Sequence, residues 1–533
     1  MRRLAVFVLW IGSLQAQWER KQNIFQLRLE NGATAEVEWI SVSTFRVRRG
    51  IEGPPRKPIV ERAVECKATE NSTALVLETS ELRLQVSKKG GLITVMLPAG
   101  LKIYSELVAQ VADGKAVLET EAPSLEKYYG LGARPHPNAD ARGLAFSPAA
   151  QFYISARGYA FWIATQAPFE FDLAKTRPDR VRITSSDLER LEYYFAFGPS
   201  LKEIWEERHK ITGSVDVASP QELELIAGPR MPRAALKLPA LDLCGSAKAL
   251  VHASLSGVLM PALDLRAFRA ESDAVFRRAA TLGVFSPIFQ DSAPFPYEGA
   301  KAAIVEEARI YRKRLSHFLV TYADETRARG YPMIHPLLHQ FPRDPEAGRR
   351  IDAYMLGDEF LLAPDCDGTA RREVYLPMGV WTNWKTEQEH RGRQTASLEG
   401  SPDGVTVLVK NGSIVPLAGI KPTDPTELHY YPKIGGEFFI YEPGAGDYSQ
   451  AHAGPAADIY RLEMESKVSR DYEWVVHHFD RPKGVDQVDA AAYSETSDAG
   501  PVAPAKWRYD SANRTLHIGI RAAAHSDVIV NIR

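Results

Sequence analysis

Acidic side chains in the middle of the chain are the first residues that could do chemistry. Asp264 lies near the end of an apolar, strand-like run that begins at Val258. Two carboxyl groups held close together can divide the roles of nucleophile and general acid, so a second carboxyl would make Asp264 a catalytic candidate. Asp242 and Asp291 are possible partners, although only their acidity recommends them.

Histidine and glycine patterns typical of cofactor sites are incomplete. His335 and His339 are four residues apart, as zinc ligands on one face of a helix would be. Pro336 and the strand-like surroundings argue against a helix there, and no Glu follows the first histidine. The run Gly130–Gly132 lacks the third glycine of a dinucleotide-binding loop. The patterns favour neither a zinc site nor a dinucleotide site.

Three tryptophans could act as flat platforms for a ligand. They are Trp162, Trp381 and Trp384. Large aromatic side chains are, however, mostly buried. We therefore favour a place in a β-sheet core for all three.

Length and charge restrict the class of protein. The 533 residues are too many for one packed core and suggest several domains. The formal net charge is −2, with basic and acidic residues interspersed, so no positive field is available for nucleic acid. A neutral substrate or partner is the better expectation.

The N-terminus has the pattern of a signal peptide, predicted over residues 1–16. Arg2 and Arg3 precede the apolar run Leu4–Leu14, and the small residue Ala16 offers a cleavage point. Such a run is too short to cross a bilayer, which needs about 20 apolar residues, and no later run is long enough. We expect an exported protein, periplasmic or extracellular, without a membrane partner. The alternative is a buried N-terminal strand.

The cysteines do not define a framework. Cys66, Cys244 and Cys366 are odd in number and far apart. Their spacing fits neither a metal site nor a dense set of disulfides. At most one disulfide can form, and three buried thiols are an equally good interpretation.

Strand patterns dominate residues 17–220. Apolar residues alternate over 25–29 and again over 82–86, and turn signals follow at Asn31-Gly32 and Gly90-Gly91. Many short strands of this kind predict a β-sandwich. This first domain should end in a helix, because Ser200 and Glu203 have the spacing of a capping box.

The rest of the chain changes character twice. Residues 221–330 combine an apolar strand-like piece with helical patterns at 247–255, 272–282 and 304–330. Strand patterns return afterwards, in two further predicted domains at 331–418 and 419–533. We therefore expect a multidomain, mostly β, α+β protein.

Several segments carry a more specific pattern. They are Tyr129–Gly132, Tyr193–Ser200, Leu255–Phe268, Leu282–Phe289, Gly330–Pro342, Tyr354–Asp358, Val374–Trp381, Asn411–Pro416 and Phe438–Tyr448. Each resembles a signature of glycoside hydrolase family 31, the α-glucosidase and α-xylosidase family. Each alone is weak evidence, but their correct order along nearly the whole chain indicates homology.

The resemblance implies a fold and an activity. The family has a galactose-mutarotase-like N-terminal β-sandwich, a (β/α)₈ barrel (TIM barrel) and two C-terminal β-sandwiches, and it acts on α-glycosides without a metal or organic cofactor. Its W-x-DMNE-type nucleophile stretch and GDN-type acid stretch are both absent here. A complete barrel needs ~250 residues, so residues 221–330 can supply only about three βα units. We expect a truncated barrel remnant.

What survives of the family's site is predicted at Asp264 and Phe268. They stand where the family keeps a sugar-contacting Asp and an aromatic residue. The pair Arg266–Ala267 replaces two glycines and crowds a backbone that passes near ligand. Residues 290–292 read Gln-Asp-Ser where the family has Arg-Asn-His, so a sugar-contacting histidine is missing.

Three roles for Asp264 stay open: a structural hydrogen bond, a sugar contact without catalysis, or catalysis in a rebuilt site. We expect a catalytically degenerate relative of the α-glycosidases, without catalytic residues, that at most binds an α-linked oligosaccharide or glycoside. The alternatives are an active α-glycosidase with relocated carboxyl groups, and a decayed gene product or structural protein.

Overall fold

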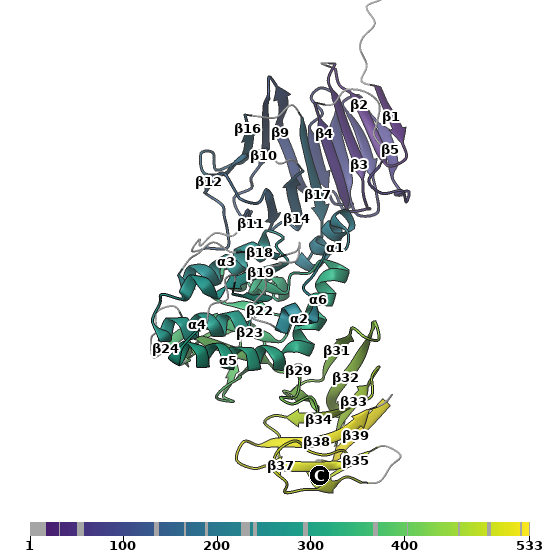
Figure 1. Ribbon diagram of the computed structural model, residues 1–533. Helices are drawn as coiled ribbons and strands as arrows, with labels where there is room; N and C mark the ends of the chain where they lie inside the picture. The colour runs from purple at the N-terminus through teal and green to yellow at the C-terminus, as the bar shows by residue number, and fades with distance from the viewer. Residues whose placement is uncertain are drawn as a thin grey trace, which may run out of the picture. The chain divides into compact units, whose positions relative to one another are not determined.

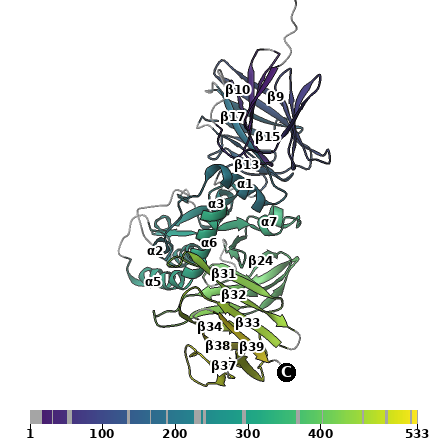
Figure 2. The same ribbon diagram turned by 90° about the vertical axis from the view of Figure 1, so that its right-hand side faces the viewer.

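The computed structural model is shown from two sides in Figures 1 and 2. It describes residues 17–30, 32–50, 58–132, 138–164, 167–186, 190–224, 235–237, 242–291, 297–365, 371–401, 403–456, 459–487, 492–522 and 525–531. The predicted signal peptide lies outside these residues. The chain divides into two compact units, Met1–Leu131 with Asp140–Ile211, and Gly132–Ala139 with Thr212–Arg533.

The first unit is a sandwich of two antiparallel sheets. Its strands are β1 (Gln17–Lys21), β2 (Ile24–Arg28), β3 (Thr34–Trp39), β4 (Thr44–Arg49), β5 (Lys67–Glu70), β6 (Ala74–Glu78), β7 (Arg83–Ser87), β8 (Ile93–Met96), β9 (Lys102–Ala112), β10 (Lys115–Glu121), β11 (Tyr128–Gly130), β12 (Ala145–Phe146), β13 (Phe152–Ser155), β14 (Tyr159–Ile163), β15 (Glu170–Leu173), β16 (Arg180–Ser185) and β17 (Leu191–Phe197). The sheet orders are β1-β2-β3-β4-β17-β14-β13-β11 and β12-β15-β16-β10-β9-β8-β7-β6-β5. Apolar residues of both sheets, such as Val37 and Leu84, share one core. The predicted β-sandwich is therefore present.

Both predicted hairpins form. Strand β2 pairs with β3, and β7 pairs with β8, each antiparallel. In the second turn Gly91 has a φ of 64°, and a Cβ atom there would lie 3.0 Å from Leu29 and 3.2 Å from Ala35. The turn therefore requires glycine. In the first turn Gly32 has a φ of 84°, and Asn31 lies outside the described residues.

A buried ion pair joins the two sheets of the sandwich. Arg49 Nη2 of β4 lies 2.5 Å from Glu106 Oε2 of β9. The Tyr193 hydroxyl donates to Glu106 Oε1 at 2.5 Å, and the Ile93 backbone N–H donates to Oε2 at 2.8 Å. Arg49 also donates to the Gly91 carbonyl at 2.7 Å. A buried charge requires partners of this kind, because its removal from water is costly.

Helix α1 (Leu201–Thr212) follows the sandwich and begins with the predicted capping box. The Ser200 backbone N–H donates to Glu203 Oε2 at 2.8 Å, and the Glu203 N–H donates to Ser200 Oγ at 3.4 Å. Gly213, at a φ of 70°, follows the last residue of the helix. Its left-handed conformation ends the helix.

The second unit begins with a small parallel sheet and its helices. Strands β18 (Ala235–Lys237), β19 (Met260–Asp264) and β20 (Ile288–Gln290) are parallel neighbours. The helices are α2 (Pro220–Glu224), α3 (Leu243–Leu255), η1 (Leu265–Phe268), α4 (Asp273–Val284), α5 (Gly299–Arg314) and α6 (Ser316–Arg329). Figure 1 shows this helical layer beside β18 and β19. The parallel pairing requires the crossover helices α3 and α4.

The helical pattern at residues 304–330 forms two helices instead of one. Helix α5 ends at Arg314 and α6 begins at Ser316. The Arg314 carbonyl accepts a hydrogen bond from the Ala418 backbone N–H at 2.7 Å, so a distant segment occupies an acceptor at the break. Gly330, at a φ of 73°, ends α6.

Two further pairs of sheets complete the second unit. The first pair consists of the sheets β21-β22-β23-β28-β25-β26 and β24-β27. Its elements are β21 (Ile334–Pro336), α7 (Leu337–Gln340), η2 (Ala347–Arg349), β22 (Tyr354–Leu356), β23 (Phe360–Pro364), β24 (Arg371–Leu376), β25 (Val380–Asn383), β26 (Glu389–Arg391), β27 (Gln394–Glu399) and β28 (Val405–Lys410). Both sheets contribute to a core around Trp381 and Leu398.

The second pair consists of the sheets β29-β30-β34-β38-β37-β36 and β31-β32-β33-β39-β35. Its strands are β29 (Ile414–Leu417), β30 (Thr426–Tyr430), β31 (Gly436–Glu442), β32 (Asp447–Ala456), β33 (Ile459–Glu465), β34 (Arg470–Val476), β35 (Gly484–Gln487), β36 (Ser494–Glu495), β37 (Lys506–Asp510), β38 (Thr515–Ala522) and β39 (His525–Asn531). Strand β29 pairs with β30, so hydrogen bonds cross the predicted boundary after residue 418.

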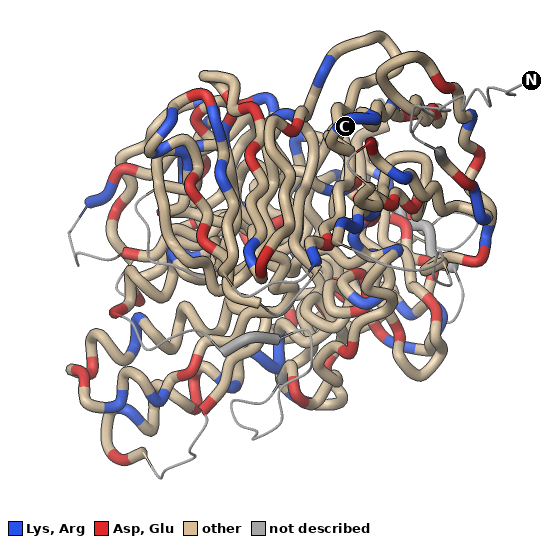
Figure 3. Tube along the Cα trace, turned by 90° about the horizontal axis from the view of Figure 1, so that it is seen from above, with Lys and Arg blue, Asp and Glu red and all other residues tan. Residues whose placement is uncertain are grey.

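Charged residues of both signs are interspersed along the trace (Figure 3). This agrees with the formal net charge of −2. Among the described helices, none combines the length and the apolar composition that a membrane span requires.

The described cysteines differ in state. Cys66 is a buried free thiol, and burial raises its pKa to about 11. Cys244, in α3, is disulfide-bonded. Cys366 lies outside the described residues. The structure thus agrees with the expectation of at most one bridge.

The Arg312 guanidinium anchors helix α5. It is fully buried and donates to four main-chain carbonyls, those of Leu223 at 2.8 Å, Val284 at 2.9 Å, Ser286 at 2.6 Å and Pro287 at 3.0 Å. Burial lowers the pKa of Arg312 to about 9. The guanidinium thereby joins α5 to α2, to the last residue of α4 and to the segment between α4 and β20.

Replacing Arg312 with Met should destabilise the protein, because four buried carbonyls lose their donor. Each unsatisfied buried acceptor costs ~1–3 kcal/mol, so we expect the free energy of unfolding to fall by at least ~3 kcal/mol. Urea denaturation measures the change. The matched control is Arg309→Met, which replaces an exposed arginine of the same helix. This variant should change the free energy of unfolding by less than ~0.5 kcal/mol. Equal effects of the two variants would contradict the anchoring role.

Glu359, just before β23, is a buried carboxyl with a raised pKa. Burial and the adjacent Asp358 raise the pKa from 4.5 to about 8, although the Tyr322 hydroxyl donates to Glu359 Oε2 at 2.7 Å. The folded protein therefore holds a proton that the unfolded chain releases above about pH 4.5. The associated stability is complete below that pH and is lost as the pH rises to about 8.

Replacing Glu359 with Gln should remove this pH dependence. We expect Glu359→Gln to raise the melting temperature at pH 8 relative to the wild type, and to have a smaller effect at pH 5. Thermal melts at the two pH values measure the difference. The control is Glu373→Gln, at an exposed position of β24, which should have the same effect on the melting temperature at both pH values. An effect of Glu359→Gln that does not change with pH would refute the assignment.

Candidate functional site

Asp264 ends strand β19 and caps the short helix that follows. Its Oδ1 accepts from the Arg266 backbone N–H at 3.1 Å, and the residue is 9% exposed. Phe268, at the end of η1, is 3% exposed. The two predicted sugar-contacting residues thus lie close in the chain and are both buried. Their contact with a saccharide stays a prediction.

Asp291 follows strand β20, beside β19. The register pairs Asp264 with Gln290, so Asp264 and Asp291 stand at neighbouring strand ends. Arg269 Nη2 donates to both Asp291 carboxylate oxygens, at 3.0 and 3.1 Å, and the Tyr297 hydroxyl donates to Oδ2 at 3.0 Å. The Asp291 carboxylate is therefore engaged in an ion pair. Ligands of parallel sheets bind at such carboxyl ends of strands.

The remaining candidates from the sequence have local roles. Asp242 caps α3, because its Oδ1 accepts from the Gly245 backbone N–H at 2.6 Å. The rings of His335 and His339 lie 4.2 Å apart between centroids, and both residues are buried. Within the described ranges, no group of three His, Cys, Asp or Glu side chains could hold a metal.

The three tryptophans have different surroundings. Trp162 stacks on Tyr194 with the ring centroids 5.1 Å apart. Trp381 is fully buried, and its Nε1 donates to the Pro377 carbonyl at 2.9 Å. Trp384 is half-buried and lines a cavity. The predicted place in a β-sheet core is confirmed for Trp381, whereas Trp384 lines a cavity instead.

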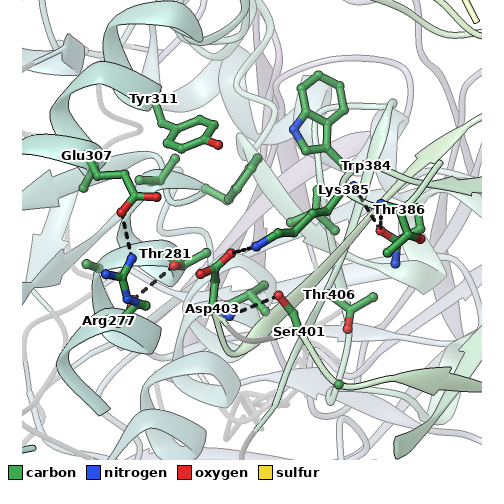
Figure 4. Close-up of a pocket in the computed structure, with 18 of the residues that line it drawn as sticks. Arg277, Thr281, Glu307, Tyr311, Trp384, Lys385, Thr386, Ser401, Asp403 and Thr406 are labelled. Atoms are coloured by element: carbon green, nitrogen blue, oxygen red, sulfur yellow. Dashed lines mark hydrogen bonds and ion pairs between the residues drawn. The ribbon is translucent and has the colours of Figure 1, made fainter. Parts of the chain in front are cut away.

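The cavity beside Trp384 measures about 690 Å³ and lies between helices α4 and α5 and the segments after β25 and β27 (Figure 4). This volume is typical of small-molecule sites. Apolar side chains, among them Phe285, Ile304 and Val407, form part of its wall. Figure 4 shows the rings of Trp384 and Tyr311 near one end of it.

Charges at the cavity are mostly paired. Arg277 Nη1 donates to Glu307 Oε2 at 2.7 Å, and Lys385 Nζ donates to Asp403 Oδ2 at 2.7 Å. The fifth charged residue of the lining, Glu399, is exposed. Because both cations are neutralised locally, the cavity favours a neutral ligand over a charged one.

Sequence patterns did not indicate this cavity. Its residues come from two stretches, 277–311 and 383–407. Helix α6 and the four strands β21 to β24 lie between them in the chain. Neither stretch contains a motif for binding. Trp384 was the one signal, and its type alone could not distinguish a cavity wall from a core.

Comparisons with known proteins agree on one family. Residues 330–415 match the glycosyl hydrolase family 31 C-terminal domain. The chain is 24% identical over 233 residues to alpha-glucosidase 2 of Bacillus thermoamyloliquefaciens, covering 40% of this chain and 29% of the relative. It is 26% identical over 181 residues to the alpha-glucosidase of Saccharolobus solfataricus, covering 31% and 26%. The match thus spans less than a third of each of these two relatives.

Solved structures share the fold. A family 31 dextranase of Flavobacterium johnsoniae, complexed with isomaltotriose, has a TM-score of 0.82 at 12% identity and covers 98% of this chain and 100% of that chain. An α-xylosidase of the same family from Xanthomonas citri has a TM-score of 0.67 at 12% identity, covering 87% and 96%. The matched C-terminal domain and the related α-glucosidases support a glycoside hydrolase family 31 identity for the chain, and the solved structures share its fold.

Proposed function

We propose that this member of the family binds a neutral saccharide and does not hydrolyse it. The observation that carries the proposal is the engagement of the carboxyl groups at the strand ends. Asp264 caps η1, and Asp291 holds Arg269 and Tyr297. Hydrolysis with retention needs one carboxylate that attacks and one carboxylic acid that donates a proton, ~5 Å apart. A carboxylate that holds a guanidinium is poorly suited to either role.

The parallel sheet supports a truncated barrel. Among the described residues between α1 and β21, strands β18, β19 and β20 supply three βα-type strands. A complete (β/α)₈ barrel has eight strands and ~250 residues. We assign the three strands to the surviving part of the family's barrel, in agreement with the missing nucleophile and acid stretches.

An α-linked glucoside or oligosaccharide is the favoured ligand class. The neighbouring dextranase is complexed with isomaltotriose and, in a second structure, with glucose. Saccharides are neutral, and the paired charges of the 690 Å³ cavity suit a neutral ligand. Its aromatic walls offer flat apolar surfaces for sugar rings.

Export from the cytoplasm is part of the proposal. The signal-peptide pattern of residues 1–16 predicts it. The disulfide-bonded state of Cys244 supports it, because disulfides persist mainly in oxidising compartments. We place the protein in the periplasm or outside the cell.

A hydrolysis assay tests the absence of turnover. We expect the purified chain to release no aryl alcohol from an aryl α-glucoside or α-xyloside above the buffer rate, and Asp264→Asn to give the same result. The Asn side chain retains an oxygen that can cap η1, so the variant should fold. Turnover by the wild type that Asp264→Asn abolishes would overturn the proposal and favour a rebuilt catalytic site.

Calorimetric titration with isomaltotriose tests the binding half of the proposal. We expect saturable binding by the wild type at neutral pH, without a change in the saccharide afterwards. A cooperatively melting protein that binds neither isomaltotriose nor other α-linked glucans would refute a saccharide-binding function.

A further inference from the structure

A second, smaller cavity adjoins the first. It measures about 220 Å³ and shares three wall residues with the 690 Å³ cavity, namely Phe285, Tyr311 and Trp384. Because the two spaces have these side chains in common, a ligand in one contacts the wall of the other. We name them the large cavity and the small cavity.

Four polar residues that line the small cavity, Arg314, Glu387, His429 and His477, belong to a chain of hydrogen bonds that also includes Glu427. Arg314 Nη2 of α5 donates to Glu427 Oε2 of β30 at 2.6 Å, and the same oxygen lies 2.7 Å from His429 Nε2. His429 Nδ1 lies 2.9 Å from Nε2 of His477, the residue after β34. His477 Nδ1 lies 3.0 Å from Glu387 Oε2, in the turn after β25.

Both carboxyl groups of this chain are ionised. Burial opposes ionisation of Glu387, but hydrogen bonds from His477 and His478 outweigh it and lower the pKa to about 2. Burial likewise opposes ionisation of Glu427, and its contacts with His429 and with the Arg314 guanidinium lower the pKa. Ionised carboxylates only accept hydrogen bonds, so each neighbouring histidine nitrogen carries a proton.

The two histidine rings are in direct contact. His429 Nδ1 lies 2.9 Å from His477 Nε2, and the ring centroids are 5.2 Å apart. Burial lowers the pKa of His477 to about 4 despite its contact with Glu387.

The chain of hydrogen bonds contains one guanidinium cation, Arg314, and two ionised carboxylates, Glu387 and Glu427. Two further titratable groups face it. His478 Nε2 lies 3.3 Å from Glu387 Oε2, and the Tyr431 ring stacks on His477 with the ring centroids 4.3 Å apart. Both histidine contacts of Glu387 use Oε2; in the part of the chain that the structure describes, Oε1 accepts no hydrogen bond.

We propose that the two cavities form one saccharide-binding site, with a sugar ring between Trp384 and Tyr311 in the large cavity and a hydroxyl group bound by Glu387 in the small cavity. The proposal rests on the saccharide-binding function above and names its location. A hydroxyl group can donate to the free Oε1, whereas an anion would be repelled there. The lining combines aromatic surface with a few fixed polar groups, the usual composition of small-molecule sites.

Two other occupants suit this site less well. A cation would have to compete with Arg277 and Lys385 for Glu307 and Asp403, which leaves it only Glu387 and the exposed Glu399. A purely apolar ligand would displace water from Glu387 without replacing the hydrogen bonds between water and this carboxylate, and such desolvation is costly. A neutral polyhydroxylated ring satisfies the aromatic and the polar walls together.

Calorimetric titration of the full chain with isomaltotriose tests the location. We expect Trp384→Ala to weaken binding at least tenfold, because the ring is a wall of both cavities. The matched control is Trp162→Ala, which removes an indole of the other unit and should bind like the wild type. Trp384 also packs near Phe360 and His429, at 5.4 and 5.8 Å between ring centroids, so thermal melts must accompany the titration.

Tyr311→Ala keeps the proposal testable if Trp384→Ala fails to fold, since Tyr311 is 47% exposed and its loss should leave the fold intact. It should also weaken binding at least tenfold. A second readout is the NMR signal of the His429 and His477 rings, which should shift with saccharide. The signal of His452, which lies in β32 and lines neither cavity, should stay unchanged. Wild type that binds nothing would refute the function. If the wild type binds isomaltotriose, Tyr311→Ala binds it equally tightly and the histidine signals do not shift, only this location of the site would be refuted.

Discussion

The second unit depends on one buried cation without a carboxylate partner. The Arg312 guanidinium binds four carbonyls, from α2, from the last residue of α4 and from the segment between α4 and β20. Its neighbours on α5 are Tyr311, a wall of both cavities, and Arg314, the first donor of the histidine chain two residues later. Fixing the rotation of α5 at Arg312 therefore fixes where these two side chains lie. The distance between α4 and α5, and with it the width of the large cavity, follows from the same contact.

Charges are paired in both units, and this decides what chemistry is available. Glu106 joins the two sheets of the sandwich through Arg49. Asp291 holds Arg269 at the strand ends, and Asp403 holds Lys385 at the cavity. Pairing makes a buried or half-buried carboxylate tolerable, since an isolated one would be costly. The same pairing supports the proposal of binding without hydrolysis, because the oxygens of these carboxylates already hold partners.

Sequence patterns located the strand ends but not their roles. The position of Asp264 after an apolar strand was predictable, because strand periodicity and the family signature agree there. Its capping bond to Arg266 was one of three open interpretations, and only backbone geometry shows it. The split between α5 and α6 was missed, because the hydrogen bond from Ala418 comes from 104 residues further along the chain than Arg314.

The sequence by itself determined the local elements: the hairpin turn at Gly91, the capping box at Ser200, the crossover helices, and the order of family signatures. These depend on neighbours a few residues away, whose side chains are read directly from the sequence. Tertiary structure alone decided that Tyr311, Trp384 and Glu387 meet, and that His429 faces His477. Contacts between residues about 50 to 75 positions apart leave no spacing pattern, because the fold that brings them together is set by the packing of the whole unit.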